Sequence, residues 1–276
     1  MGPAKFEVGD VMRIATFDIR LCNLDRHAGN ILVSRSAPYQ CRSSFYEAAV
    51  PDLHSTRISA SAPASTGLLL GDSEVGLVLS STVTTTSAYR LVPIDHGFCL
   101  PHVLQLSDVT FAWLAWPQVK LPVPDDVKEY VSRLNADADC DRIRYLVGAA
   151  IPETHLLTLK VCTKLLQSCL SQGLSLYEVA MFMIVPKGST ISRLQALVNR
   201  AVSAVVARDR CKSQVHSLSP LRLSPLTVHV EKKDGVSISD ETLHHAMALQ
   251  NGGCLWEELS ASIDSAVNVL VDQAHS

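Results

Sequence analysis

The sequence predicts an α+β fold that is mainly helical and carries a few short strands. Of its 276 residues, 47% are apolar and 18% are charged, which is enough apolar surface to bury a core and excludes global disorder. Apolar side chains recur at helical spacing through residues 125–206. Strand-like runs are short and lie closer to the N-terminus, at residues 30–33 and 89–94.

Each predicted element rests on a local pattern. Apolar residues from Val11 to Leu21 indicate a helix that runs into the polar loop at 22–25. Asp125 and Asp126 favour a helix start, because acidic side chains complement the helix dipole there. Gly173 suits the C-terminal cap of a helix over 151–171. Further helices are predicted at 175–184 and 190–206. Residues 98–124 are predicted to form a loop or short helices. A strand is predicted at 226–230, and two helices follow it, the last at 256–271.

Residues 34–88 differ in composition from the rest of the chain. Serine, alanine and threonine dominate this segment, prolines stand at positions 38, 51 and 63, and charges are few. Such a composition predicts a surface insertion with weak or absent structure, in which only residues 75–79 resemble a strand. Loop-closure entropy grows slowly with length, so an insertion of this size is tolerable.

Composition and charge weigh against two classes of protein. The 24 basic and 27 acidic residues give a net charge of −3, so the chain lacks the basic excess typical of nucleic-acid binding. No run of about 18 apolar residues occurs, and no membrane-spanning helix is predicted. The eight cysteines include no Cys-x-x-Cys pair, which indicates reduced, mostly buried thiols in a cytoplasmic protein.

Two clusters fall short of a metal site. The acidic run 137–141 begins like a calcium-binding loop, but Arg142 stands where that loop needs glycine. His244 and His245 precede Cys254, yet no four-ligand zinc spacing is present. We therefore expect ordinary helix surfaces at both places.

Two short motifs indicate phosphoryl-transfer chemistry when they are taken together. In Asp25-Arg26-His27-Ala28-Gly29-Asn30 an aspartate precedes an asparagine by five residues, and a strand-like run follows. Kinase catalytic loops have this spacing, since the aspartate accepts the proton of the attacking hydroxyl and the asparagine binds Mg²⁺. The second motif, Asp95-His96-Gly97, ends the other strand-like run, where a kinase has its second Mg²⁺-binding carboxylate.

Longer stretches around both motifs resemble a known family. Protein kinases put His-Arg before the catalytic aspartate, whereas here the order is Asp25-Arg26-His27. The sequence resembles the phosphatidylinositol 3-/4-kinase superfamily, and best the plant-type gamma branch of the type II phosphatidylinositol 4-kinases. The resemblance covers residues 4–33 and 89–206, including Asp18–Leu32, Pro93–Pro101, Trp113, Trp116–Gln118, Ile151–Thr154 and Gly173–Ser175.

This resemblance implies a kinase that transfers the γ-phosphoryl group of ATP to the 4-hydroxyl of phosphatidylinositol at a membrane surface. Carried over by position, Asp25 is the catalytic aspartate. Asn30 and Asp95 hold Mg²⁺, and together with Gly97 they contact the ATP cofactor. Peripheral association of a cytoplasmic protein with the membrane follows from the same resemblance.

Other positions receive supporting roles from the resemblance. Arg26 and His27 support the catalytic loop or the transferring phosphate. Residues 98–124 form the segment that meets the lipid headgroup, where Lys120 is a candidate headgroup contact. Trp113 and Trp116 either enter the bilayer interface, as amphipathic indoles do, or pack in the core.

Besides the insertion 34–88, the sequence departs from a complete kinase in a second respect. No Gly-x-Gly motif and no phosphate-gripping lysine precede the catalytic loop. We therefore expect residues 1–206 to form only the C-terminal lobe of the catalytic domain, with the insertion 34–88, followed by a linker and helical tail at 207–276. Such a chain should turn over ATP slowly or not at all. A protein Ser/Thr kinase and a non-catalytic scaffold remain the alternatives.

Overall fold

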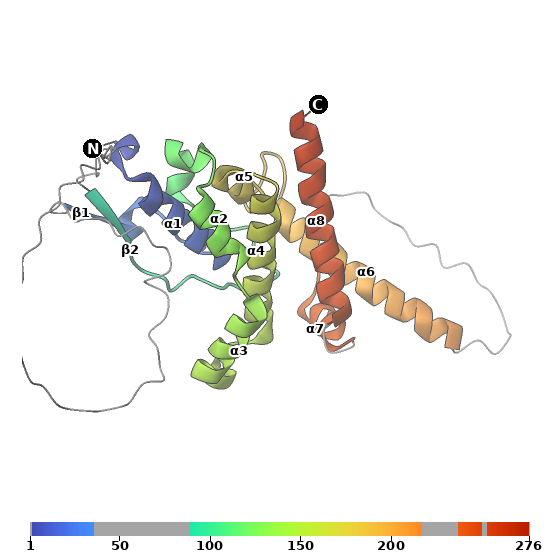
Figure 1. Ribbon diagram of the computed structural model, residues 1–276. Coiled ribbons are helices and arrows are strands. Elements are labelled where there is room, and N and C mark those ends of the chain that lie inside the picture. Colours follow the sequence, from blue (N-terminus) through green and yellow to red (C-terminus); the bar gives the residue numbers. More distant parts are fainter. Residues whose placement is uncertain (1, 36–88, 217–236, 250–252, 276) are drawn as a thin grey trace, which may run out of the picture.

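The computed structural model describes residues 2–35, 89–216, 237–249 and 253–275. In this part of the chain a body of helices carries one two-stranded hairpin at its side (Figure 1), which confirms the predicted fold class. The order of the helices and strands is α1 (Val8–Arg20), β1 (Ile31–Arg35), β2 (Tyr89–Pro93), α2 (Asp125–Ser132), α3 (Ala136–Val147), α4 (Glu153–Ser171), α5 (Leu176–Met181), α6 (Arg193–His216), α7 (Asp240–Ala248) and α8 (Gly253–His275).

Helix α4 forms the centre of the body. It packs against α1, α2, α3, α5 and α8, and its apolar side chains Val161, Leu165 and Leu166 are fully buried. The helix ends where predicted, because Gly173 adopts a φ of +80°, a left-handed conformation that glycine takes without strain. Its buried apolar side chains join α1, α2, α5 and α8 in one continuous core, and α3 packs on α4 through a second, small cluster of Cys140, Leu156 and Leu159.

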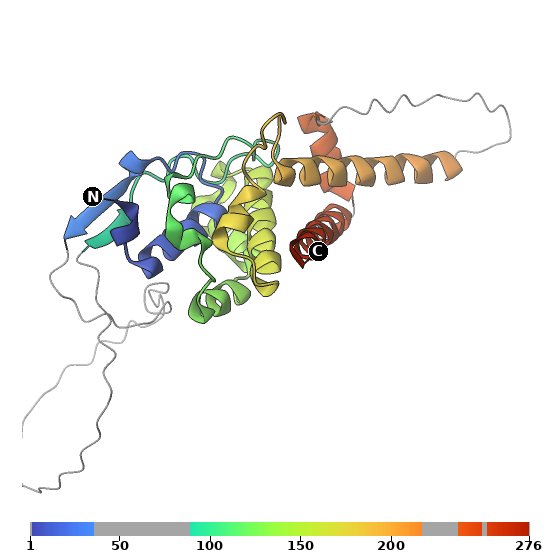
Figure 2. The same cartoon turned by 90° about the horizontal axis from the view of Figure 1, so that it is seen from above.

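Helix α6 continues ten residues beyond its predicted end at residue 206. The extension is polar and therefore carries no apolar pattern, but ion pairs hold it to the tail helices. Arg208 lies 2.6 Å from Glu258 of α8, and Asp209 lies 3.2 Å from His245 of α7. Figure 2 shows α6 extending away from the body, with α8 beside its first half. Apolar residues of α7 and α8 join the same core as residues 1–206.

Helix α3 was predicted only as part of a broad helical region. Its N-cap is Asn135, whose side-chain oxygen accepts a hydrogen bond from the Ala138 amide at 3.0 Å. Asp137 and Asp139 lie in the first turn, so the acidic run belongs to a helix start, as its rejection as a calcium loop implies. The strands predicted at 75–79 and 226–230 lie outside the described residues. Of the described helices, none has the length and apolar character to cross a membrane.

The hairpin brings the two sequence motifs together. Strands β1 and β2 pair antiparallel with Ile31 opposite Pro93 and Leu32 opposite Val92. Asp10 of α1 anchors the hairpin, since its carboxylate accepts a hydrogen bond from the Leu91 amide at 3.0 Å. Because β1 begins where β2 ends, the residues just before β1 and just after β2 lie at the same end of the hairpin.

Candidate active site at the end of the hairpin

The loop between α1 and β1 is held by the side chain of Asn23. Its amide nitrogen donates to Asp18 Oδ1 at 3.0 Å, and its oxygen accepts from the Asp25 main-chain amide at 3.0 Å. Cys22 precedes it with a φ of +47°, so the chain turns sharply out of α1 through a left-handed residue. The loop therefore has a defined conformation before Asp25 is reached.

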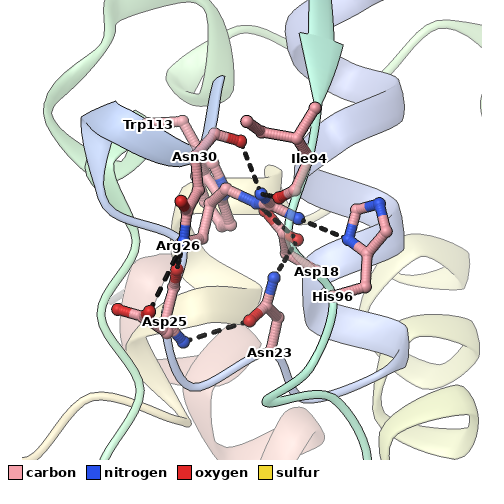
Figure 3. Close-up of polar contacts among 8 residues, drawn as sticks. All are labelled: Asp18, Asn23, Asp25, Arg26, Asn30, Ile94, His96 and Trp113. Atoms are coloured by element: carbon pink, nitrogen blue, oxygen red, sulfur yellow. Dashed lines mark hydrogen bonds and ion pairs between the residues drawn. The ribbon is translucent and has the colours of Figure 1, made fainter. Parts of the chain in front are cut away.

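Asp25 and Asn30 face one another across this loop, as Figure 3 shows. The Asn30 amide nitrogen donates to the Asp25 main-chain oxygen at 2.9 Å and lies 3.4 Å from the carboxylate oxygen Oδ2. Asn30 is buried, whereas the Asp25 side chain keeps 40% of its surface exposed. The carboxylate of Asp25 is thus both fixed in place and open to an incoming group.

His27 caps the turn that carries Asn30. Its Nδ1 accepts a hydrogen bond from the Gly29 amide at 3.0 Å at the start of the short helix η2 (Ala28–Asn30). A Cβ atom on Gly29 would lie only 2.8 Å from the His27 ring, which explains the glycine. The other ring nitrogen lies 3.8 Å from Asp25 Oδ2. His27 supports the loop conformation, and its half-exposed ring lies beside the aspartate.

Asp95 lies two residues after Pro93, the last paired residue of β2. The Ile94 amide donates to the Asn30 main-chain oxygen at 3.0 Å, which sets Asp95 at the Asn30 end of the hairpin. Asp95 has a φ of +53°, a conformation in which aspartate is tolerated better than most residues. Its carboxylate is exposed and accepts one long bond, 3.4 Å, from the Gly97 amide. The structure therefore brings Asp25, Asn30 and Asp95 to one end of the hairpin.

Arg26 joins the two motifs from beneath. Its Nη1 donates to the main-chain oxygens of Asn30 and Ile94, at 2.7 Å each, and its Nη2 lies 3.0 Å from His96 Nδ1 (Figure 3). The side chain has no exposed surface. Arg26 therefore supports the hairpin end, and the phosphate contact also predicted for it stays a prediction.

Asp18 in turn binds Arg26. The sequence patterns did not identify Asp18 as a site residue. Both carboxylate oxygens accept from Arg26 Nε, at 2.9 and 3.0 Å, and Oδ2 also accepts from Trp113 Nε1 at 2.9 Å. Burial raises the pKa of the Asp18 carboxyl above its ordinary value, while the Trp113 hydrogen bond and the Arg26 charge oppose that shift. Its place on the buried face of α1 was the available signal, because a carboxylate there needs a partner.

Two tryptophans that the sequence assigns equally to the core or to the bilayer interface lie in the core. Trp113 is fully buried and stacks on Phe111 with ring centroids 4.5 Å apart, and Trp116 is 8% exposed and packs on Phe6. An indole with its N–H bound to a buried carboxylate has no surface to offer a membrane. Lys120 is exposed, and its ammonium lies 4.9 Å from the centre of the Tyr177 ring. The headgroup contact predicted for it stays a prediction.

The donor atoms at the hairpin end fit a magnesium ion bound together with phosphates. They are the amide oxygen of Asn30 and the carboxylate of Asp95, hard oxygen ligands of the kind that Mg²⁺ prefers. Two such ligands leave room for phosphate oxygens and water. Among the described residues no group of three or more histidine, cysteine or acidic side chains forms a metal site by itself. The arrangement therefore suits an ion that arrives with its nucleotide.

Comparison with known proteins agrees with this geometry. The family model for phosphatidylinositol 3- and 4-kinase matches residues 2–179, which include both motifs and the helices around them. The chain belongs to the phosphatidylinositol 3- and 4-kinase family.

The similar curated proteins are plant enzymes of one branch of this kinase family. Phosphatidylinositol 4-kinase gamma 2 and gamma 8 of Arabidopsis thaliana are 31% identical over 206 residues and 33% identical over 210 residues, each covering 75% of this chain. Phosphatidylinositol 4-kinase gamma 4 of Oryza sativa subsp. japonica is 28% identical over 235 residues, or 84% of the chain. The chain spans 28%, 32% and 33% of these three relatives. No solved structure matches it.

Proposed function

We propose that the hairpin end is the acceptor-activating and metal-binding part of a lipid kinase site, and that its reaction is transfer of the γ-phosphoryl group of ATP to the 4-hydroxyl of phosphatidylinositol. One observation carries the proposal: an exposed aspartate carboxylate, a buried asparagine amide and a second exposed aspartate meet at one end of the hairpin. The names of the plant gamma relatives supply the lipid substrate.

Each residue then has a chemical role. Asp25 accepts the proton of the attacking hydroxyl, since its carboxylate is half-exposed and oriented by Asn30. Asn30 and Asp95 would hold Mg²⁺, which neutralises charge on the phosphates when it is bound. Arg26 keeps these ligands at a fixed separation through the main chain, and the Gly97 amide orients Asp95.

The outward face of the hairpin suits the base of a nucleotide. Leu32 and Val92 form a directly opposed pair on this face and are 51% and 45% exposed. Their strands lead to Asn30 and Asp95, so a base lying on this apolar pair would direct its phosphates toward the metal ligands. An exposed apolar pair beside polar ligands is typical of a site for an amphipathic ligand.

A chimera tests the function of the site. Residues 2–179 replace the matching segment of Arabidopsis phosphatidylinositol 4-kinase gamma 2, and labelled phosphate from ATP is followed into phosphatidylinositol vesicles and into a protein acceptor. We expect phosphatidylinositol 4-phosphate as the product, identified by chromatography of the deacylated lipid. Asp25→Asn should abolish the product, whereas Asp126→Asn, at an exposed aspartate in the first turn of α2, should leave it unchanged.

Two other results would replace the proposal. Label in protein but not in lipid would assign a protein Ser/Thr kinase, because the same loop can serve either hydroxyl. Label in neither, from a chimera that folds and binds Mg²⁺·ATP, would assign a non-catalytic scaffold. The chain by itself should turn over ATP slowly, because it contains no Gly-x-Gly phosphate loop.

A further inference from the structure

The segment that follows the Asp95 motif is held on both sides by its main chain. The Leu100 amide donates to the Leu21 main-chain oxygen at 2.7 Å, so the segment begins against the end of α1. The Leu100 oxygen accepts a hydrogen bond from His155 Nδ1 of α4 at 2.7 Å. Helices α1 and α4 therefore fix the chain directly after the candidate site.

His102 continues this segment and links it to the tail helix α7. Its Nε2 lies 3.6 Å from Oδ1 of Asp240, the first residue of α7. Its ring meets the His155 ring of α4 edge to face, with ring centroids 5.7 Å apart. The His102 side chain is only 17% exposed. His102 is thus enclosed between α4 and α7, and undocking of α7 would return its ring to water.

The hydrogen bonds of His102 determine which ring nitrogen carries the proton. The Leu104 amide donates to Nδ1 at 3.2 Å, so Nδ1 is the acceptor and Nε2 carries the proton that faces Asp240. A second proton must bind at Nδ1, where two N–H groups would then oppose each other. Protonation therefore breaks the turn at Leu104 and displaces the ring that contacts Asp240.

The surroundings of His102 disfavour its protonated form as well. Burial lowers the pKa of His102 below its ordinary value of 6.5, the Asp240 charge opposes this shift, and His155 and His244 add to it. Release of α7 would return His102 to its ordinary pKa, so the released form binds more protons as the pH falls through 6.5. Acid therefore favours release, and a rising pH favours the docked form.

We propose that α7 is a clamp on the segment after the Asp95 motif, and that protonation of His102 releases it. Leu243 and Ala246 bury α7 against the core with side chains that do not titrate, so His102 supplies the response to protons. The clamped segment belongs to residues 98–124, the stretch expected to meet the acceptor. Release would loosen the acceptor side of the site. The clamp goes beyond the proposed function, because docking of α7 requires no substrate.

Hydrogen exchange of the full chain tests the clamp. Protection of the α7 amides, corrected for the intrinsic exchange rate, is compared with that of the α4 amides at about pH 7.5 and about pH 5.5. We expect α7 to lose about two- to tenfold in acid, where the ordinary pKa of 6.5 sets the upper limit, and α4 to change less. In His102→Asn this loss should disappear, because the amide oxygen can accept from Leu104 but cannot be protonated. His245→Asn is the matched control and should keep the loss, since the His245 side chain is 50% exposed and pairs with Asp209 of α6.

An NMR titration of the His102 ring gives a second test that needs no variant. Its signals should titrate below pH 6.5, over the same range in which α7 loses protection. Protection of α7 that ignores pH, an equal loss in α4, or an unchanged loss in His102→Asn would each overturn the inference. A His102 ring that titrates at or above its ordinary pKa would also overturn it.

The outcomes separate this inference from the proposed function. Acid release of α7 together with a chimera that phosphorylates no lipid would contradict only the proposed function. An active chimera, together with an α7 that stays docked in acid, would contradict only the inference.

Discussion

Arg26 and Asp18 form an ion pair in which neither side chain has any exposed surface, with Nε 2.9 Å from Oδ2. The same guanidinium bonds the main chain of both motifs, at Asn30 and Ile94. A buried ion pair adds little net stability over an apolar replacement, but one unpaired partner is strongly destabilising. The pair therefore acts chiefly by fixing where Asn30 and Asp95 lie.

Removal of one partner of this pair should destabilise the fold. Arg26→Met leaves the Asp18 carboxylate buried without a charged partner. The free energy of unfolding, measured by urea titration, should fall by about 3–5 kcal/mol. The double variant Arg26→Met/Asp18→Leu should lose clearly less, because no charge is then left unpaired. Arg133→Ala, which breaks an exposed pair with Glu129, serves as the control and should change stability by less than about 0.5 kcal/mol. A double variant as unstable as the single one would contradict this reading.

The cap formed by His27 gives a prediction about binding rather than stability. Gly29→Ala puts a methyl group 2.8 Å from the His27 ring, so the exposed ring must move out of its cap on the turn that ends at Asn30. Affinity for Mg²⁺·ATP should fall by roughly 10- to 100-fold, as it does for other changes behind a metal ligand. In a His27→Ala background the same substitution should cause no further loss. Gly9→Ala in α1 is the control, since its new Cβ would have an ordinary 3.5 Å contact with Arg13.

Trp113 should behave as a core residue. Trp113→Phe keeps most of the ring but removes the indole N–H, so that Asp18 Oδ2 keeps only its hydrogen bond from Arg26 Nε. The free energy of unfolding should fall by about 1.5–3 kcal/mol, the usual contribution of a hydrogen bond to a charged group. Vesicle binding of the folded variant should equal that of the parent chain. A selective loss of vesicle binding at full stability would restore the membrane contact that burial argues against.

Local patterns predicted most of the fold. Apolar spacing located α1, α4 and α8, and the left-handed Gly173 ended α4 as expected. The end of α6 was missed, because its last turns are polar and are held by ion pairs to α7 and α8. Residues that lie far apart in sequence make those contacts, so helical periodicity carries no sign of them.

Only part of the candidate site could be predicted, because contacts between residues far apart in sequence also support it. Asp25, Asn30 and Asp95 follow from motif spacing and from the strands beside them, and the structure brings them together. The buried hydrogen bonds of Asp18 that support these three residues could not be predicted from the motifs. Asp18 bonds residues 5, 8 and 95 positions away, and only the folded chain brings these together. Trp113 was assigned to core or membrane with equal weight because an indole suits both until its N–H partner is known.

The attachment of the tail helix α8 should weaken in acid. Burial alone would raise the pKa of Asp264, but the Lys164 ammonium at 2.8 Å and the Ser168 hydroxyl outweigh it and hold that pKa below its ordinary value. A lowered folded-state pKa stabilises the fold above the ordinary value of 3.8, and this stabilisation is lost as the pH falls through the lowered one. Urea titrations below about pH 4 should show this loss, and Asp264→Asn should reduce it. An unchanged pH profile in that variant would contradict the assignment.

The central claim is that Asn30 and Asp95 form one metal site together with the phosphates of a nucleotide. Paramagnetic broadening by Mn²⁺·ATP tests it most directly, because the ring protons of His27 and His96 lie beside the site and report even weak binding. We predict selective broadening of these two histidine signals in the parent chain and in Asp126→Asn, and its loss in Asp95→Asn. Equal broadening in Asp95→Asn, or broadening spread evenly over the ten histidines, would contradict the account.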